Sequence, residues 1–202
     1  MSTRIMFNVP NLLSMYRIAC VPVIMLLSFF DGPVATWVNV FIFFWACISD
    51  LLDGIIARKT GQITVLGRFL DATSDKILVG GVLLILICFD KITGVWMIPA
   101  LIIFVREIFI SGLREFLGLY KISVPVSWMG KWKATVQMAA SGFLMAGEYG
   151  ESVVPHSIFI GKILLLAATV LTALSAWDYM KKGYETIRSL EEKGDAGEST
   201  PA

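Results

Sequence analysis

The chain has 202 residues, of which 56% are apolar and only 16% charged, and its mean hydropathy is +0.75. Soluble domains contain about 45–50% apolar and about 25% charged residues. The composition of this chain excludes a disordered chain, a collagen-like fibre and a disulfide-stapled secreted module. It predicts an integral membrane protein. The 17 basic and 16 acidic residues leave a net charge of +1, which argues against nucleic acid as an electrostatic partner.

Six apolar segments are long enough to cross a bilayer, which takes about 20 residues in a helix. In chain order they lie at residues 11–31, 34–58, 67–89, 93–117, 126–147 and 157–181. Arg17 falls inside the first segment, where a charge is unusual. We therefore expect an all-α integral membrane protein with six transmembrane helices, in which residues 1–182 form one domain and residues 183–202 form a polar, flexible tail.

The basic residues predict the orientation, because Lys and Arg concentrate on the cytoplasmic side of a membrane protein. With both termini inside, all 17 basic residues except Lys91 and Lys162 fall on the inner side or in the inner halves of the helices. The opposite orientation would place most of them outside. We therefore expect an N-in, C-in protein.

Four aspartates lie at the inner ends of the second and third segments: Asp50, Asp53, Asp71 and Asp75. The first two are three residues apart and the last two are four apart, so each pair shares one face of its helix. A hairpin of the two helices would bring all four carboxylates into one pocket. Such a cluster at a membrane boundary needs a cation to offset its desolvation and repulsion.

Carboxylate oxygens are the ligands that Mg²⁺ and Mn²⁺ prefer. The three Cys residues lack the spacing of zinc ligands and the single His, His156, lies on the outer side, so a zinc site is not expected. Two such ions can hold a pyrophosphate and stabilise an in-line displacement. Three alternatives remain: ion pairs with Arg58, Arg68 and Lys76, a structural scaffold, or a divalent-cation transporter. A transporter should place its carboxylates nearer the middle of the membrane.

The pattern Asp50-x2-Asp53-Gly54-x2-Ala57-Arg58-x8-Gly67-x3-Asp71-x3-Asp75 resembles the signature of the CDP-alcohol phosphotransferases. The resemblance implies a six-helix bundle in the cell inner membrane, a homodimer, and an active site that opens to the cytoplasm. It also implies that the four aspartates bind two ions of Mg²⁺ or Mn²⁺ and that Asp75 is in addition the general base. The residues implied to bind the cytidine nucleotide lipid CDP-diacylglycerol are Asn11, Ser14, Gly54, Ala57, Arg58 and Gly67.

Two later blocks, Arg106 to Glu115 and Ser127 to Gln137, are similar to those of bacterial phosphatidylglycerophosphate synthases within that family, although Ala134 departs from the commoner pattern. Their cations lie toward the inner ends of the fourth and fifth segments and suit an anionic acceptor. The expected phosphate-binding residues are Arg106, Arg114, Lys131 and Lys133. Glu107 is expected to pair with one of the two arginines. The alternative is that these cations bind anionic lipid head groups.

The resemblance therefore implies metal-dependent transfer of a phosphatidyl group from CDP-diacylglycerol to sn-glycerol 3-phosphate. The expected products are phosphatidylglycerophosphate and CMP, and the reaction would be a step of phospholipid biosynthesis. Membrane phospholipid and a second copy of the chain are the expected partners. The nearest rival is a sister enzyme with another acceptor, such as an inositol phosphate.

Overall fold

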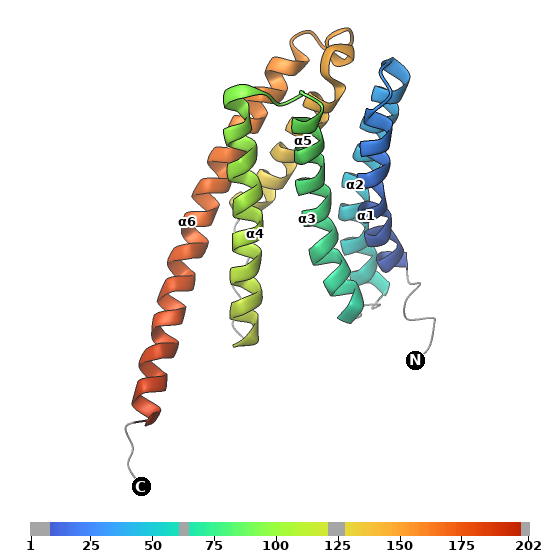
Figure 1. Cartoon of the computed structure of the whole chain (residues 1–202). Coiled ribbons are helices and arrows are strands. Elements are labelled where there is room, and N and C mark those ends of the chain that lie inside the picture. The colour runs from blue at the N-terminus through green and yellow to red at the C-terminus, as the bar shows by residue number, and fades with distance from the viewer. Residues whose placement is uncertain (1–8, 61–64, 121–127, 199–202) are drawn as a thin grey trace.

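The computed structural model describes residues 9–60, 65–120 and 128–198, and within these ranges it contains helices and no strand. In chain order the elements are α1 (Val9–Ser28), α2 (Pro33–Thr60), α3 (Val65–Cys88), the short 3₁₀ helix η2 (Gly94–Trp96), α4 (Met97–Leu119), α5 (Trp128–Glu151) and α6 (Ser157–Glu198) (Figure 1). The six long helices follow the six predicted segments, and the all-α prediction is confirmed.

Four of these helices contain a stretch that is long and apolar enough to cross a membrane: Asn11–Ser28, Pro33–Asp50, Gly94–Leu119 and Ser157–Arg188. In the described parts of α3 and α5 no such stretch is found. The first described turns of α3 carry Asp71, Asp75 and Lys76, and α5 has polar residues along one face, which lowers the hydropathy of both helices. The expectation of six spans thus has support for four helices, and the orientation stays a prediction.

Helices from distant parts of the sequence pack into one bundle. α1 packs on both α2 and α3, α5 packs on α6 and α2, and α4 packs on α6. Buried Leu78 and Leu86 of α3 lie in the same apolar core as Leu144 of α5 and Leu165 of α6. Gly81 allows α3 to approach α1 closely, since a Cβ atom there would lie 2.5 Å from Cγ1 of Val21.

The two described ends of the chain, at the start of α1 and the end of α6, lie at the same end of the bundle (Figure 1). Because neighbouring long helices alternate in direction, the C-terminal ends of α2 and α4 and the N-terminal ends of α3 and α5 also lie at this end. We call it the terminal end of the bundle. The terminal end therefore carries both predicted groups of charged residues. We call the four aspartates, Asp50, Asp53, Asp71 and Asp75, the acidic group. We call the four cations, Arg106, Arg114, Lys131 and Lys133, together with Glu107, the basic group.

The tail expected at 183–202 differs in the structure, because α6 continues without interruption to Glu198. Its 42 residues correspond to about 63 Å of helix, roughly twice the thickness of a bilayer's hydrocarbon core. Figure 1 shows α6 extending well beyond the other helices. The Lys, Arg, Glu and Leu residues of this segment favour a helix even though few apolar residues are available for burial.

Candidate active site

Arg17 is the cation at the centre of the acidic group. Its side chain is fully buried, with 0% of its surface exposed. The guanidinium donates through Nη1 to Oδ1 of Asp50 on α2 and through Nη2 to Oδ1 of Asp71 on α3, at 2.9 Å in the second case. Nη2 also lies 3.4 Å from Oγ of Ser14 on the same helix. One side chain of α1 therefore joins the first three helices.

The structure brings Asp50 and Asp71 together, as the spacing predicted, because both accept hydrogen bonds from one guanidinium. Asp75 lies one helical turn further along α3 than Asp71, on the same face. Gly67 lies one turn before Asp71. Asn11 and Ser14 on α1 are both buried, so α1 presents a polar face at this end of the bundle.

Five other predicted residues lie within helices, but their side chains fall outside the described part of the structure. They are Asp53, Gly54, Ala57 and Arg58 on α2 and Lys131 on α5. Among the described side chains, no group of three or more acidic, His or Cys residues forms a metal site. The donors that are described are carboxylate oxygens on neighbouring helices, and this donor set suits a hard divalent cation. The four-aspartate site stays a prediction.

The basic group is organised by Glu107 of α4. Its carboxylate accepts hydrogen bonds from Nζ of Lys133 on α5 and, at 3.3 Å, from Nη1 of Arg106. The Lys133 side chain is almost completely buried. The expectation that Glu107 pairs with an arginine is confirmed for Arg106. Arg114 lies two turns further along α4 and is exposed.

Arg106 also makes contacts that the sequence analysis missed. Nη2 donates to Oγ of Ser175 on α6 at 2.8 Å, and the guanidinium carbon lies 6.0 Å from the centroid of the Tyr179 ring. Ser175 and Tyr179 lie in an apolar segment about 70 residues further along the chain. Nothing in the local sequence identifies them as partners.

Asp75 links the acidic and basic groups. Its carboxylate is within electrostatic range of Asp50 and Arg17, and also of Glu107 and Lys133. Asp75, the predicted general base, therefore lies within range of charged residues on α1, α2, α4 and α5.

A long apolar groove starts beside this site. It has a volume of about 910 Å³ and lies between α2 and α5. Asp50 lines one end and Ser157 the other, and the residues between them are almost all apolar, among them Val40, Phe44 and Met138. A groove of this kind connects a polar site at the end of the bundle with the apolar surface along its side.

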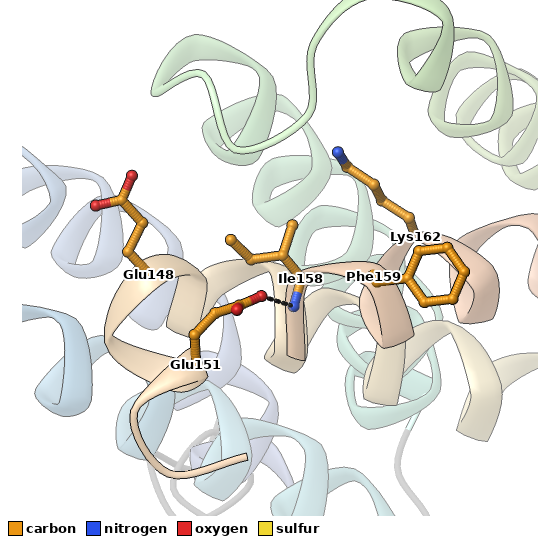
Figure 2. A pocket seen from close by; sticks show the side chains of 5 residues that line it. All are labelled: Glu148, Glu151, Ile158, Phe159 and Lys162. Atoms are coloured by element: carbon orange, nitrogen blue, oxygen red, sulfur yellow. Dashed lines mark hydrogen bonds between the residues drawn. The ribbon is translucent and has the colours of Figure 1, made fainter. Parts of the chain in front are cut away.

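A second pocket, of about 450 Å³, lies at the opposite end of the bundle, where α5 turns into α6 (Figure 2). Glu148, Glu151 and Lys162 line it together with two apolar side chains. Glu151 accepts a hydrogen bond at 3.3 Å from the backbone N–H of Ile158 in the first turn of α6. A carboxylate stabilises a helix at this position, so Glu151 has a structural reason to be there.

Comparison with known proteins agrees with this geometry. Residues 7–174 match the sequence model of the CDP-alcohol phosphatidyltransferase family. The chain belongs to this family. The matched region contains every aspartate of the acidic group and every cation of the basic group, and the resemblance inferred from the signature is confirmed.

Bacterial relatives match over almost their whole lengths. A protein of Rickettsia bellii is 41% identical over 174 residues, which cover 86% of this chain and 94% of the relative. A protein of Haemophilus influenzae is 35% identical over 178 residues, which cover 87% of this chain and 92% of the relative. A protein of Bacillus subtilis is 32% identical over a region that covers 91% of this chain and 99% of the relative. All three are named CDP-diacylglycerol–glycerol-3-phosphate 3-phosphatidyltransferase.

Proposed function

We propose that this chain transfers the phosphatidyl group of CDP-diacylglycerol to sn-glycerol 3-phosphate, which yields phosphatidylglycerophosphate and CMP. The observation that carries the proposal is the position of Asp75, in electrostatic range of Asp50 and Arg17 on one side and of Glu107 and the buried Lys133 on the other. The names of the relatives indicate the same donor and acceptor.

The donor binds at the acidic group. Asp50, Asp53, Asp71 and Asp75 would hold two ions of Mg²⁺ or Mn²⁺, which would neutralise the pyrophosphate of CDP-diacylglycerol. Around it, the nucleotide binds to Asn11, Ser14, Gly54, Ala57, Arg58 and Gly67. Small residues on two adjacent helices leave room for a ligand to approach the backbone.

The lipid part of the donor lies in the groove between α2 and α5. This groove begins at Asp50 and is apolar along its length, so an acyl chain can extend from the site without crossing a polar surface. Burial of apolar surface is favourable in proportion to its area. A water-soluble nucleotide would have no use for the groove.

The acceptor binds at the basic group through its phosphate. Lys133 and Arg114 contact the phosphate together with Lys131, while Arg106 helps to fix Glu107 and is itself held by Ser175 on α6. Phosphate binding by these cations presents the primary hydroxyl of glycerol to Asp75. Asp75 takes the hydroxyl proton, the oxygen bonds to the lipid-side phosphorus, and the bond from that phosphorus to CMP breaks.

We also infer the setting of the enzyme. The start of α1, the end of α6 and both charged groups lie at the terminal end of the bundle, and the basic residues favour a cytoplasmic position for that end. The active site then faces the cytoplasm from the inner membrane, where glycerol 3-phosphate has direct access. The homodimer implied by the family resemblance belongs to the same proposal.

The test is CMP release by the purified protein in detergent, with CDP-diacylglycerol and Mg²⁺ present throughout. sn-Glycerol 3-phosphate, an inositol phosphate and serine are offered in separate reactions, each with and without EDTA. The proposal expects EDTA-sensitive release with glycerol 3-phosphate alone. Release with a different acceptor would contradict the assignment of the basic group, and no release from folded protein would contradict the enzyme itself. Glu148→Gln removes a carboxylate at the far end of the bundle, so this variant should be as active as the unchanged chain.

A further inference from the structure

Arg17 lies in an unusual position for a charged residue. It is in the interior of an apolar helix, and its side chain has no exposed surface. A buried cation is costly to the fold unless it is paired and hydrogen-bonded. Here Arg17 is paired with two carboxylates, and they come from two other helices.

The geometry of the contacts is specific to arginine. The guanidinium is planar and presents its donors in a fixed arrangement. Since Nη1 donates to Asp50 and Nη2 donates to Asp71, the distance between the two carboxylates is set by the width of one rigid group. A lysine would supply the charge at a single point and could not fix this spacing.

The charge has a second effect. Asp50 and Asp71 repel each other when they are side by side, and the half-buried position of Asp50 limits the screening of this repulsion by water. Arg17 offsets this repulsion from within the bundle. The two carboxylates can therefore stay together while still offering their other oxygen atoms to a ligand.

We propose that Arg17 is a positioning residue of the divalent-cation site: it holds the carboxylates of Asp50 and Asp71 side by side and partly neutralises them, so that the site is assembled before the metal ion binds. This inference rests on the metal site of the proposed function. It gives Arg17 a role that acts through the two aspartates, without contact with either substrate.

The role predicts a link between Arg17 and the metal that thermal unfolding in detergent can measure. In EDTA, Arg17→Gln should unfold roughly 10 °C below the unchanged chain, because the half-buried Asp50 and the exposed Asp71 lose the fully buried cation that joins them. Addition of Mg²⁺ should then raise the unfolding temperature of this variant at least twice as much as that of the unchanged chain, because the ion replaces the missing charge. Arg17→Lys should lie between the two.

Arg106→Gln is the matched control. It also removes a largely buried arginine, but one that pairs with Glu107 and Ser175 rather than with the aspartates. Its unfolding temperature should fall while its response to Mg²⁺ equals that of the unchanged chain. An equal Mg²⁺ response in Arg17→Gln and the unchanged chain would overturn the inference. Absence of any Mg²⁺ response in the unchanged chain would instead contradict the metal site of the proposed function.

A double variant tests the role of Arg17 without any metal. In EDTA, Asp50→Asn should destabilise the Arg17→Gln background much less than it destabilises the unchanged chain, since the contact is already lost. Additive losses would overturn the inference. If Arg17→Gln alone does not fold, recovery of folded protein on adding Asp50→Asn supports the inference, and failure of both variants to fold in EDTA and in Mg²⁺ contradicts it.

Discussion

Lys133 of α5 donates a hydrogen bond to Glu107 of α4, so the buried ammonium group is fixed in electrostatic range of Asp75 on α3. Three helices thus contribute one charge each to a small region at the terminal end of the bundle. In the proposed function, this cation binds the acceptor phosphate and this carboxylate takes the hydroxyl proton.

Removal of the general base should stop the reaction while leaving the fold in place. Asp75→Asn keeps the size of the side chain but cannot accept the hydroxyl proton. We expect CMP release to fall by at least about 100-fold, in the range typical for loss of general base catalysis. Gel filtration and thermal unfolding would show that the variant is folded. Activity within about twofold of the unchanged chain would remove Asp75 from this role.

Glu107→Gln should act through the cations that it binds. Without the carboxylate, Lys133 is no longer held in place, so the KM for glycerol 3-phosphate should rise more than the KM for CDP-diacylglycerol. Stability should also fall, by about 3–5 kcal/mol if the pair behaves as other buried ion pairs do.

Glu115→Gln provides the control for that substitution. Glu115 is an exposed carboxylate on the same helix, and it lies 3.4 Å from Nζ of Lys76. Exposed pairs of this kind contribute about 0–1 kcal/mol. If the control raised the KM for the acceptor as much as Glu107→Gln does, the effect would not come from Lys133.

Arg114→Ala should weaken binding of the acceptor with little effect on the donor. Arg114 is exposed on α4, so its removal creates no cavity and should leave the unfolding temperature nearly unchanged. We expect several-fold more glycerol 3-phosphate to be needed for half-maximal CMP release. An equal change in the requirement for CDP-diacylglycerol would contradict a role in phosphate binding.

Gly142→Leu should test the groove between α2 and α5. Gly142 lines this groove, and a Cβ atom there would meet no other atom within 4 Å, so a larger side chain can enter the groove without displacing its neighbours. Activity with long-chain CDP-diacylglycerol should fall more than activity with a dioctanoyl analogue. Gly112→Leu is the control, because Gly112 is equally open but lies on α4, away from the groove. The same loss with both chain lengths would argue against an acyl chain in the groove.

The helices were predictable from the sequence, but their contacts were not. Apolar segments of the right length located all six long helices. A hairpin of the second and third segments, each with two aspartates on one face, predicted that Asp50 and Asp71 would meet. In contrast, Arg17 looked only like an interruption of the first apolar segment. Its partners lie 33 and 54 residues away, and helical periodicity does not say which faces of two distant helices will touch.

The same reason explains two further differences. The contact of Arg106 with Ser175 joins α4 to α6 over 69 residues, and neither residue has a local pattern that identifies the other. The helical end of α6 is not predictable from hydropathy, because this segment has few apolar residues and therefore resembles a tail. Its helix-favouring residues extend α6 without burial in a core.

The most direct test of the central claim is transfer of labelled sn-glycerol 3-phosphate into lipid. The purified chain in detergent is given CDP-diacylglycerol, Mg²⁺ and acceptor labelled with ¹⁴C, and the organic extract is counted and analysed by mass spectrometry. We predict that label enters the extract as phosphatidylglycerophosphate, in equal amount to the CMP released, and that EDTA or Asp75→Asn prevents it. CMP release without label in the lipid, or transfer that continues in EDTA, would contradict the mechanism.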